Sequence, residues 1–255
     1  MRMPKWPAAL LLSLCLGSCA SSPPEVKVGA SATVATRPIP VRRVVLVHGI
    51  WQSESRSFGR IRHALEAMGV ECLGPSMKPS DGGDGLVKEA QQLKDDIDQR
   101  FGPNEHFTLV AFSMGGLASR YYLQELGGAK RCDAFYTIST PHHGTWISYL
   151  YFGKGARDMH PDSPFLKKLN ATEGNLGKLP IVSYRTKADI VIVPSRSSIW
   201  DRAQNIAVSC PLHQMMTAAP AVREDMFRRM ELPPQPGKEP PLPSKHRKAK
   251  ASSAR

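Results

Sequence analysis

The junction between residues 107–112 and residues 114–126 constrains the fold more than any other part of the sequence. The first range is an apolar run typical of a buried strand, the second has the pattern of a helix, and Ser113 stands between them. A chain that turns directly from strand to helix brings two backbones close together, so small residues are needed there. Ala111 and Gly115 stand two positions before and after the serine. The junction therefore predicts a strand, a strained turn and a helix.

Ser113 has two interpretations at this turn. Residues 111–115, Ala-Phe-Ser-Met-Gly, are close to Gly-x-Ser-x-Gly, the pattern in which a strained turn exposes a serine nucleophile. Ala111 replaces the first glycine, and its methyl group is a small intrusion that weakens the match slightly. Serine is also a common N-cap of ordinary helices, so the pentapeptide alone leaves both roles open.

An earlier segment supports the nucleophile. Residues 43–48 form a β-branched run that ends in His48, and Gly49 follows it, which predicts a strand followed by a turn. Acyl transfer needs two N–H donors at the developing oxyanion, one after the nucleophile and one in the loop after an earlier strand. The backbone N–H groups of Met114 and Ile50 are the candidates. His48 itself either takes part in the chemistry or bonds locally in the turn.

An acid and a histidine are expected later in the chain, in that order. Residues 180–185 predict a buried strand, and Asp189 follows in the next loop. Residues 205–209 predict the last strand, and His213 follows it within a few residues. Both side chains come after the carboxyl ends of strands, where open α/β sheets place their sites. Ser113, Asp189 and His213 are therefore the candidate catalytic residues.

Other acids and histidines compete for these roles. His142 and His143 also follow a predicted strand, residues 134–138, but they precede every well-placed acid, and we expect them to shape the wall of the site. The competing acids are Asp158 and Asp162, in a long insertion, and Asp201, which is better placed as a surface or N-cap residue. The residues expected to line a substrate pocket are His48, Trp51, His142, His143 and Trp146.

Together, these segments resemble a known family. The strand ending in His-Gly-Ile, the Ala-Phe-Ser-Met-Gly-Gly turn, the Thr-Pro-His-His-Gly-Thr turn, the Asp189 loop and the late His213 are similar to the bacterial triacylglycerol lipases and esterases of the α/β-hydrolase superfamily. The resemblance covers about residues 41–230. It implies hydrolysis of carboxylic esters through an acyl-enzyme, with Ser113, Asp189 and His213 as triad and Ile50 and Met114 as oxyanion donors. It does not fix the acyl chain length.

Two alternatives to a lipase or esterase stay open. An envelope phospholipase or acyltransferase would use the same triad and differ only in substrate or acceptor. A non-catalytic, membrane-tethered binding module would use the same scaffold, although the intact serine, acid and histidine argue against it. We expect no cofactor and no metal, an ester or lipid substrate, and a monomer. Nucleic-acid binding is disfavoured, because the sequence has no basic motif interleaved with aromatic residues.

The order of apolar runs predicts the fold class. A chain of 255 residues with 41% hydrophobic content can bury one substantial core. Alternating strand-like and helix-like runs predict a compact α/β-hydrolase domain over residues 41–231, with a mostly parallel sheet of about six strands flanked by helices. The predicted strands are residues 43–48, 70–73, 107–112, 133–139, 180–186 and 205–209. The predicted helices are residues 56–68, 86–101, 114–126, 163–169 and 220–230.

The two ends of the chain have different characters. Residues 1–18 predict a signal peptide, because basic residues precede an apolar run. Leu-Gly-Ser-Cys, ending at Cys19, resembles the lipobox of bacterial lipoproteins, and Ser21 at the second position after the cysteine implies passage to the outer membrane. The alternatives are a plain cleavable signal, with a periplasmic or secreted protein, and an uncleaved anchor. Residues 19–40 are expected to be a linker.

Residues 232–255 are expected to form a disordered, proline-rich and basic tail. The tail contributes +5 of the formal net charge of +12, so much of the positive charge is outside the predicted domain. It either adheres to anionic lipid head groups or other envelope polyanions, or stays solvated without a partner.

Three further features have open roles. If Cys19 is acylated, an odd number of cysteines follows it, Cys72, Cys132 and Cys210, and we expect no disulfide. The glycine-rich residues 74–85 lack the ending of a phosphate-binding loop and predict a flexible loop on the substrate side. The aromatic cluster that begins at Trp146 either lines an acyl pocket, forms a lid, or packs on the sheet.

Overall fold

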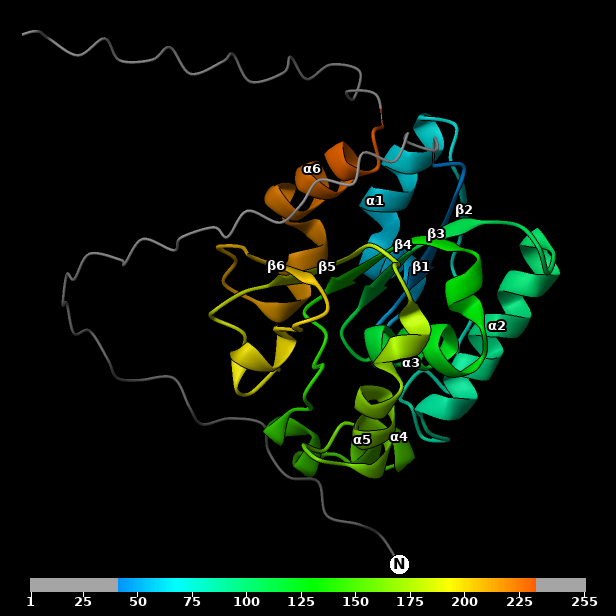
Figure 1. The fold of residues 1–255 in the computed structure, drawn as a ribbon. Coiled ribbons are helices and arrows are strands. Elements are labelled where there is room, and N and C mark those ends of the chain that lie inside the picture. Colours follow the sequence, from blue (N-terminus) through cyan, green and yellow to red (C-terminus); the bar gives the residue numbers. More distant parts are fainter. Residues whose placement is uncertain (1–40, 233–255) are drawn as a thin grey trace, which may run out of the picture. The chain divides into compact units, whose positions relative to one another are not determined.

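All six strands run parallel in one sheet, in the spatial order β2-β1-β3-β4-β5-β6 (Figure 1). The computed structural model describes residues 41–232. Its strands are β1 (Arg43–Val47), β2 (Glu71–Leu73), β3 (Phe107–Phe112), β4 (Cys132–Ile138), β5 (Ile181–Arg185) and β6 (Gln204–Ala207). Its α-helices are α1 (Glu54–Ala67), α2 (Leu86–Phe101), α3 (Met114–Glu125), α4 (Lys154–Asp158), α5 (Pro164–Ala171) and α6 (Pro220–Arg229). The predicted fold class is confirmed, and each predicted strand or helix end lies within two residues of the observed one.

Two layers of helices cover the sheet, because successive side chains of each strand point to opposite faces. Val44 and Leu46 of β1 pack with α1 and α6 in one apolar cluster, whereas Val45 and Val47 pack with α2 and α3 in the other. Strand β3, in the interior of the sheet, is buried at all of its positions. The two clusters together hold the carboxyl ends of β1, β3, β5 and β6 at one edge of the sheet, where the candidate residues follow.

The chain between β4 and β5 forms a helical insertion that the sequence predicts only in part. It contains the 3-10 helices η2 (Trp146–Leu150) and η3 (Glu173–Leu176) besides α4 and α5. Only α5 is among the predicted helices, because η2 and α4 are too short to show a helical period. Distant groups hold α4 in place: the Gly155 N–H donates to the Gly82 carbonyl at 2.9 Å, and the Asp158 carboxylate accepts from the Leu86 N–H at 2.8 Å.

Several predictions concern residues that the structure does not describe. The signal peptide, Cys19, the linker up to residue 40 and the tail from residue 233 onward lie outside the described range. Within residues 41–232, no helix is both long enough and apolar enough to span a bilayer. Cys72, Cys132 and Cys210 are buried free thiols. Burial raises the pKa of Cys72 to about 12, so this thiol stays protonated at neutral pH.

Candidate active site

Ser113 occupies the turn between β3 and α3 with a backbone φ of 53° and ψ of −127°. A positive φ is strained for a residue with a side chain, and the sheet holds it here. The Ser113 N–H donates to the Ile138 carbonyl at the end of β4, at 2.9 Å. Only glycine fits two residues later, since a Cβ atom at Gly115 would lie 2.2 Å from the His48 carbonyl oxygen. The close approach of strand and helix that the sequence predicts is present.

The side chains of Ser113, His213 and Asp189 form one chain of hydrogen bonds. His213 is the first residue of the 3-10 helix η5 (His213–Ala218), and its Nε2 lies 2.9 Å from Ser113 Oγ. Its Nδ1 lies 2.8 Å and 3.1 Å from the two carboxylate oxygens of Asp189. The ring of His213 also packs against Phe112, with centroids 4.8 Å apart. Three buried side chains from separate strand ends are thus brought together.

The loop after β5 keeps Asp189 ionised. Burial alone would raise the pKa of Asp189, but the hydrogen bond and charge of His213 and two backbone N–H groups outweigh burial and hold the pKa below its ordinary value. Those N–H groups, of Val191 and Ile192, donate to Asp189 Oδ1 at 3.0 Å and 2.9 Å. An ionised carboxylate in this position orients the imidazole and stabilises a positive charge on it.

The backbone N–H groups of Ile50, in the loop after β1, and of Met114 donate to no acceptor among residues 41–232. Met114 is the first residue of α3, and donors in the first turn of a helix have no partner within the helix. Ile50 follows Gly49, whose backbone lies close to the serine: a Cβ atom at Gly49 would lie 3.1 Å from Ser113 Cβ. The two N–H groups that the sequence predicts as oxyanion donors are therefore both free to bind an anion.

Two of the residues predicted to line a substrate pocket, His48 and His142, are buried instead. His48 Nδ1 lies 2.9 Å from the carbonyl oxygen of the next residue, so its bond is local to the turn. His142 Nε2 lies 3.1 Å from Thr137 Oγ1, and the ring stacks on Trp200 with centroids 4.5 Å apart. Burial and the charge of Arg120 lower the pKa of His142 well below its ordinary value, so the ring stays neutral. Neither side chain is exposed on the surface of a pocket.

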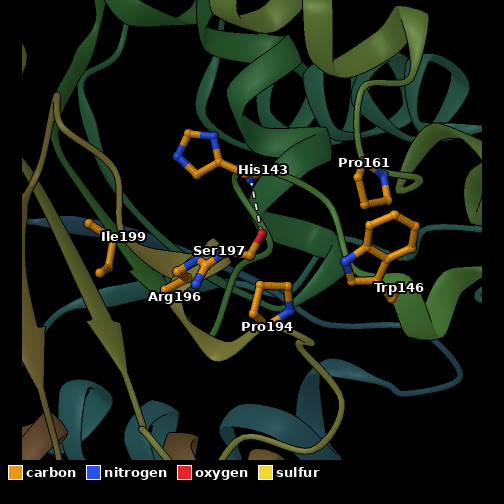
Figure 2. A pocket seen from close by; sticks show the side chains of 7 residues that line it. All are labelled: His143, Trp146, Pro161, Pro194, Arg196, Ser197 and Ile199. Atoms are coloured by element: carbon orange, nitrogen blue, oxygen red, sulfur yellow. Dashed lines mark hydrogen bonds between the residues drawn. The ribbon is translucent and has the colours of Figure 1, made fainter.

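The other predicted pocket residues are open to solvent. His143 and Trp146 line a cavity of about 420 Å³ between the insertion and the loop after β5, and Figure 2 shows their side chains on two sides of it. Its remaining lining residues are Pro161, Pro194, Arg196, Ser197 and Ile199. The His143 N–H donates to Ser197 Oγ at 3.2 Å. Trp51 is half exposed and contacts Tyr151 edge-on, with centroids 4.9 Å apart. No member of the Ser113 hydrogen-bond chain lines this cavity.

Thr145 links the insertion to the loop that carries Asp189, which the sequence prediction missed. Thr145 Oγ1 donates to the Val191 carbonyl at 2.8 Å and accepts from the Val193 N–H at 2.9 Å. The residue lies in the Thr-Pro-His-His-Gly-Thr turn, which the prediction treated as a wall of the site. A threonine in the loop after a strand is the only sequence signal of this role, and such threonines are too common to identify it.

Thr186 makes a second link of this kind. Its Oγ1 donates to the Cys210 carbonyl at 2.6 Å, which joins the loop carrying Asp189 to the loop carrying His213. The Ala188 N–H donates to Thr186 Oγ1 at 3.3 Å. The acid and the histidine are therefore held in one network of buried hydrogen bonds, which limits their relative movement.

The glycine-rich residues 74–85 form the loop after β2. The Ser80 carbonyl accepts a hydrogen bond from the Trp51 N–H at 2.7 Å, and Gly82 contacts α4. The loop therefore lies between the turn after β1 and the insertion, on the side of the sheet that the prediction gave it. Within residues 41–232, no three His, Cys, Asp or Glu side chains are grouped as metal ligands would be.

Several solved structures share this arrangement of strands and helices. A mature lipase of Bacillus licheniformis, BlEst2, is 17% identical with a TM-score of 0.55, and the match covers 77% of this chain and 95% of the lipase. The chain has the α/β-hydrolase fold. Lipase B of Aspergillus fumigatus is 17% identical with a TM-score of 0.58, and 71% of this chain matches 52% of that one. A monoacylglycerol lipase of Paleococcus ferrophilus is 16% identical with a TM-score of 0.53, covering 74% and 92% of the two chains.

Comparison of the whole sequence with known families and curated proteins identifies no relative: no model of a protein family matches the sequence, and no curated protein is significantly similar to it. In the α/β-hydrolase fold a nucleophile sits on a strand-to-helix turn, and its acid and histidine partners follow in that order. Ser113, Asp189 and His213 stand in this order along the chain and in hydrogen-bond contact in space.

Proposed function

We propose that the protein is a serine hydrolase of carboxylic esters, a lipase or esterase that works through an acyl-enzyme. One observation carries the proposal: Ser113 Oγ, His213 and Asp189 are joined by hydrogen bonds of 2.9 Å and 2.8 Å at a strained turn. An N-cap serine needs no such partner. An N-cap serine would accept a hydrogen bond from an N–H in the first turn of its helix. The side chain of Ser113 makes no such bond to the described residues of α3.

In the proposed mechanism, His213 Nε2 removes the proton of Ser113 Oγ as the oxygen attacks the ester carbonyl carbon. Asp189 orients the ring and stabilises the imidazolium that results. The carbonyl oxygen becomes an oxyanion and binds the free N–H groups of Ile50 and Met114. His213 then donates its proton to the leaving alcohol, which departs. Water, activated by the same ring, attacks the acyl-enzyme and releases the acid.

The first experiment compares the protein with its Ser113→Ala variant on p-nitrophenyl esters of increasing chain length. We expect the variant to lose at least about three orders of magnitude in kcat/KM with little change in unfolding temperature. A rate that rises with chain length supports a lipase, and a maximum at short chains supports an esterase. Retained turnover in the variant would overturn the proposal.

Substrate comparison separates the alternatives that use the same triad. Triglyceride, phospholipid and short esters are assayed side by side, with and without an alcohol acceptor. Preference for phospholipid assigns a phospholipase, and acyl transfer to the alcohol over water assigns an acyltransferase. A fluorophosphonate probe that fails to label Ser113 in the folded protein would favour a binding module.

We also propose that the protein is exported and anchored by lipid at Cys19, at the outer membrane. The support is the sequence pattern alone, basic residues before an apolar run that ends at Leu-Gly-Ser-Cys. Several acyl chains on one cysteine would give a stable anchor, because each buried methylene adds about 0.8 kcal/mol. The protein would then be held at a lipid surface.

A further inference from the structure

The large apolar side chains that are exposed in this domain gather at one edge of the sheet. Ten such residues are exposed within residues 41–232, and nine of them lie on loops that follow β1, β4, β5 and β6. The nine are Trp51, five side chains from Trp146 to Phe152, Ile190, Leu212 and Met215, which we call the apolar rim. The tenth, Val87, lies on α2. An even scatter over the surface would not place nine of ten on four loops of one edge.

The apolar rim adjoins the candidate active site along the chain. Trp51 directly follows the oxyanion donor Ile50, and Ile190 directly follows Asp189. Leu212, about half exposed, directly precedes His213. Phe152 is fully exposed and Ile190 is 69% exposed, so these side chains are covered by nothing in the described chain. Soluble monomers seldom expose apolar side chains grouped in this way without a binding role.

The charges among the rim residues are mostly positive. Within residues 146–157 and 187–196, the exposed cations are Lys154, Arg157, Lys187 and Arg196, and none of them makes an ion pair within residues 41–232. The one carboxylate in these two ranges is Asp189, which is buried against His213. The exposed Asp162 and Asp201 lie outside the ranges, and the partly buried Asp158 accepts from the Leu86 N–H.

We propose that the apolar rim docks on an anionic lipid surface. Tryptophan and tyrosine rings favour the boundary between head groups and acyl chains, and exposed leucine and phenylalanine insert below it. Lysine and arginine beside them are attracted to anionic head groups. A second copy of the chain is a poorer occupant, because a two-fold contact would set four unpaired cations against their own copies. The neighbouring loop of residues 74–85 carries Asp81 and Asp84 and no exposed large apolar residue, so it stays outside the rim.

The docking has a consequence for substrate choice, which rests on the proposed function. A rim inserted in a lipid surface would hold Ser113 at the level of esters that reside in that surface. Such esters would reach the serine without first crossing water. The substrate class would then be membrane-resident or aggregated esters rather than dissolved ones.

The test is hydrogen exchange, measured by mass spectrometry, on the full chain of the Ser113→Ala variant with phosphatidylcholine vesicles and with vesicles that also contain phosphatidylglycerol. We expect the anionic vesicles to slow exchange in residues 146–152, 187–196 and 212–215. Exchange in residues 102–106 and 127–131, on loops at the opposite edge of the sheet, should not change. This readout is specific to each segment, so vesicle contact by either end of the chain does not imitate it. Unchanged exchange in the rim segments, with or without bound vesicles, would overturn the proposal.

Matched variants test the rim directly in a vesicle flotation assay. Leu150→Ser with Phe152→Ser should weaken the partition to anionic vesicles about tenfold or more, whereas Ala67→Ser, at an exposed position at the end of α1 away from the rim, should not. Lys187→Gln with Arg196→Gln should lower the preference for anionic over neutral vesicles about tenfold. Equal partition of all these variants would overturn the proposal, as would rim protection that depends on protein concentration and needs no lipid, which would assign a second copy.

The catalytic proposal and the docking proposal fail separately. Ser113→Ala removes the nucleophile and should bind vesicles as the unchanged protein does. If the unchanged protein hydrolyses no ester but its rim segments exchange more slowly on anionic vesicles, the proposed function alone is contradicted. Normal hydrolysis of dissolved esters with no rim protection would contradict the docking alone.

Discussion

The elbow at Ser113 depends on the absence of a side chain at Gly115. A Cβ atom there would lie 2.2 Å from the His48 carbonyl oxygen and 2.9 Å from that of Val47, so backbone on both sides would have to move. Gly115→Ala should lower the free energy of unfolding by about 2 to 3 kcal/mol, as overpacking typically does. Urea unfolding followed by circular dichroism measures this change.

Gly59 supplies the matched control. It lies in the interior of α1, and a Cβ atom there would meet nothing within 4 Å. Gly59→Ala should leave the free energy of unfolding unchanged or raise it by about 0.5 to 1 kcal/mol, because alanine is the better helix former. Equal effects of the two variants would show that the elbow tolerates a methyl group and would contradict the steric argument.

Glu89 makes stability depend on pH. It is buried in the first turn of α2, and neither carboxylate oxygen has a hydrogen-bond partner within residues 41–232. Burial, and then the nearby carboxylates of Asp81 and Asp158, raise the pKa of Glu89 from its ordinary value of 4.5 to about 8. The folded protein therefore holds a proton that the unfolded chain releases between these values. Stability from this group is full below pH 4.5, falls as the pH rises and is lost above pH 8.

Glu89→Gln should remove this dependence. The amide is neutral at every pH, so the variant should match the unchanged protein near pH 5 and unfold at a higher temperature at pH 8. Thermal unfolding at both pH values, with the buffer ionic strength held constant, provides the measurement. A difference in unfolding temperature that is the same at pH 5 and pH 8 would contradict a buried neutral carboxyl group.

Single residues differ in how far the sequence predicts them. Ser113, Asp189 and His213 follow the ends of strands, and parallel strands bring those ends to one edge, so their neighbourhood follows from local pattern. His142 and His143 are adjacent in sequence, yet the first points inward onto Trp200 and the second lines the open cavity. Trp200, on which His142 stacks, belongs to a distant loop, and no local sequence pattern reveals this contact.

Among the secondary-structure elements, predictability follows length. Helices α2 and α3 are long runs with a helical pattern, strand β3 is a continuous apolar run, and the predicted bounds of all three are confirmed almost to the residue. Helix α4 has only five residues and is held by the Gly155 contact to Gly82 and by Asp158 on the Leu86 N–H. Such an element is determined by tertiary contacts between segments about 70 residues apart, as Leu86 and Asp158 are.

The insertion and the loop after β5 are joined by Thr145, which we expect to position Asp189 rather than to touch substrate. Thr145→Val removes the hydroxyl that bonds both Val191 and Val193 while keeping the shape of the side chain. The kcat on p-nitrophenyl esters should fall about 10- to 100-fold with little change in KM, because a small misplacement of the triad slows chemistry more than binding. Steady-state kinetics separate the two constants.

Thr145→Ser is the control for this prediction. It keeps the hydroxyl and should restore most of kcat, whereas loss through packing alone would not be restored by the smaller side chain. Equal kcat values for the valine variant and the unchanged protein would show that the backbone bonds of the loop hold Asp189 without Thr145.

At the scale of the whole molecule, the order of runs predicts a parallel α/β sheet because most of the strand runs are followed by a helix run. It does not predict the order β2-β1-β3-β4-β5-β6, since several strand orders satisfy the same alternation. Nor does it predict the apolar rim, because exposure of Leu150 or Ile190 depends on the absence of covering groups, which only the assembled fold determines.

The apolar rim and the proposed lipid anchor at Cys19 make one joint prediction about location. Cys19→Ala removes the only thiol at the lipobox, so the variant expressed in a Gram-negative host should lose incorporation of radiolabelled palmitate. The rim should still give weak, salt-sensitive association with membranes, because its cations are screened by salt and its apolar residues alone add limited affinity. Washing membranes with high salt should therefore release the variant and leave the unchanged protein bound. Release of both proteins by the wash, without palmitate labelling of either, would contradict the anchor.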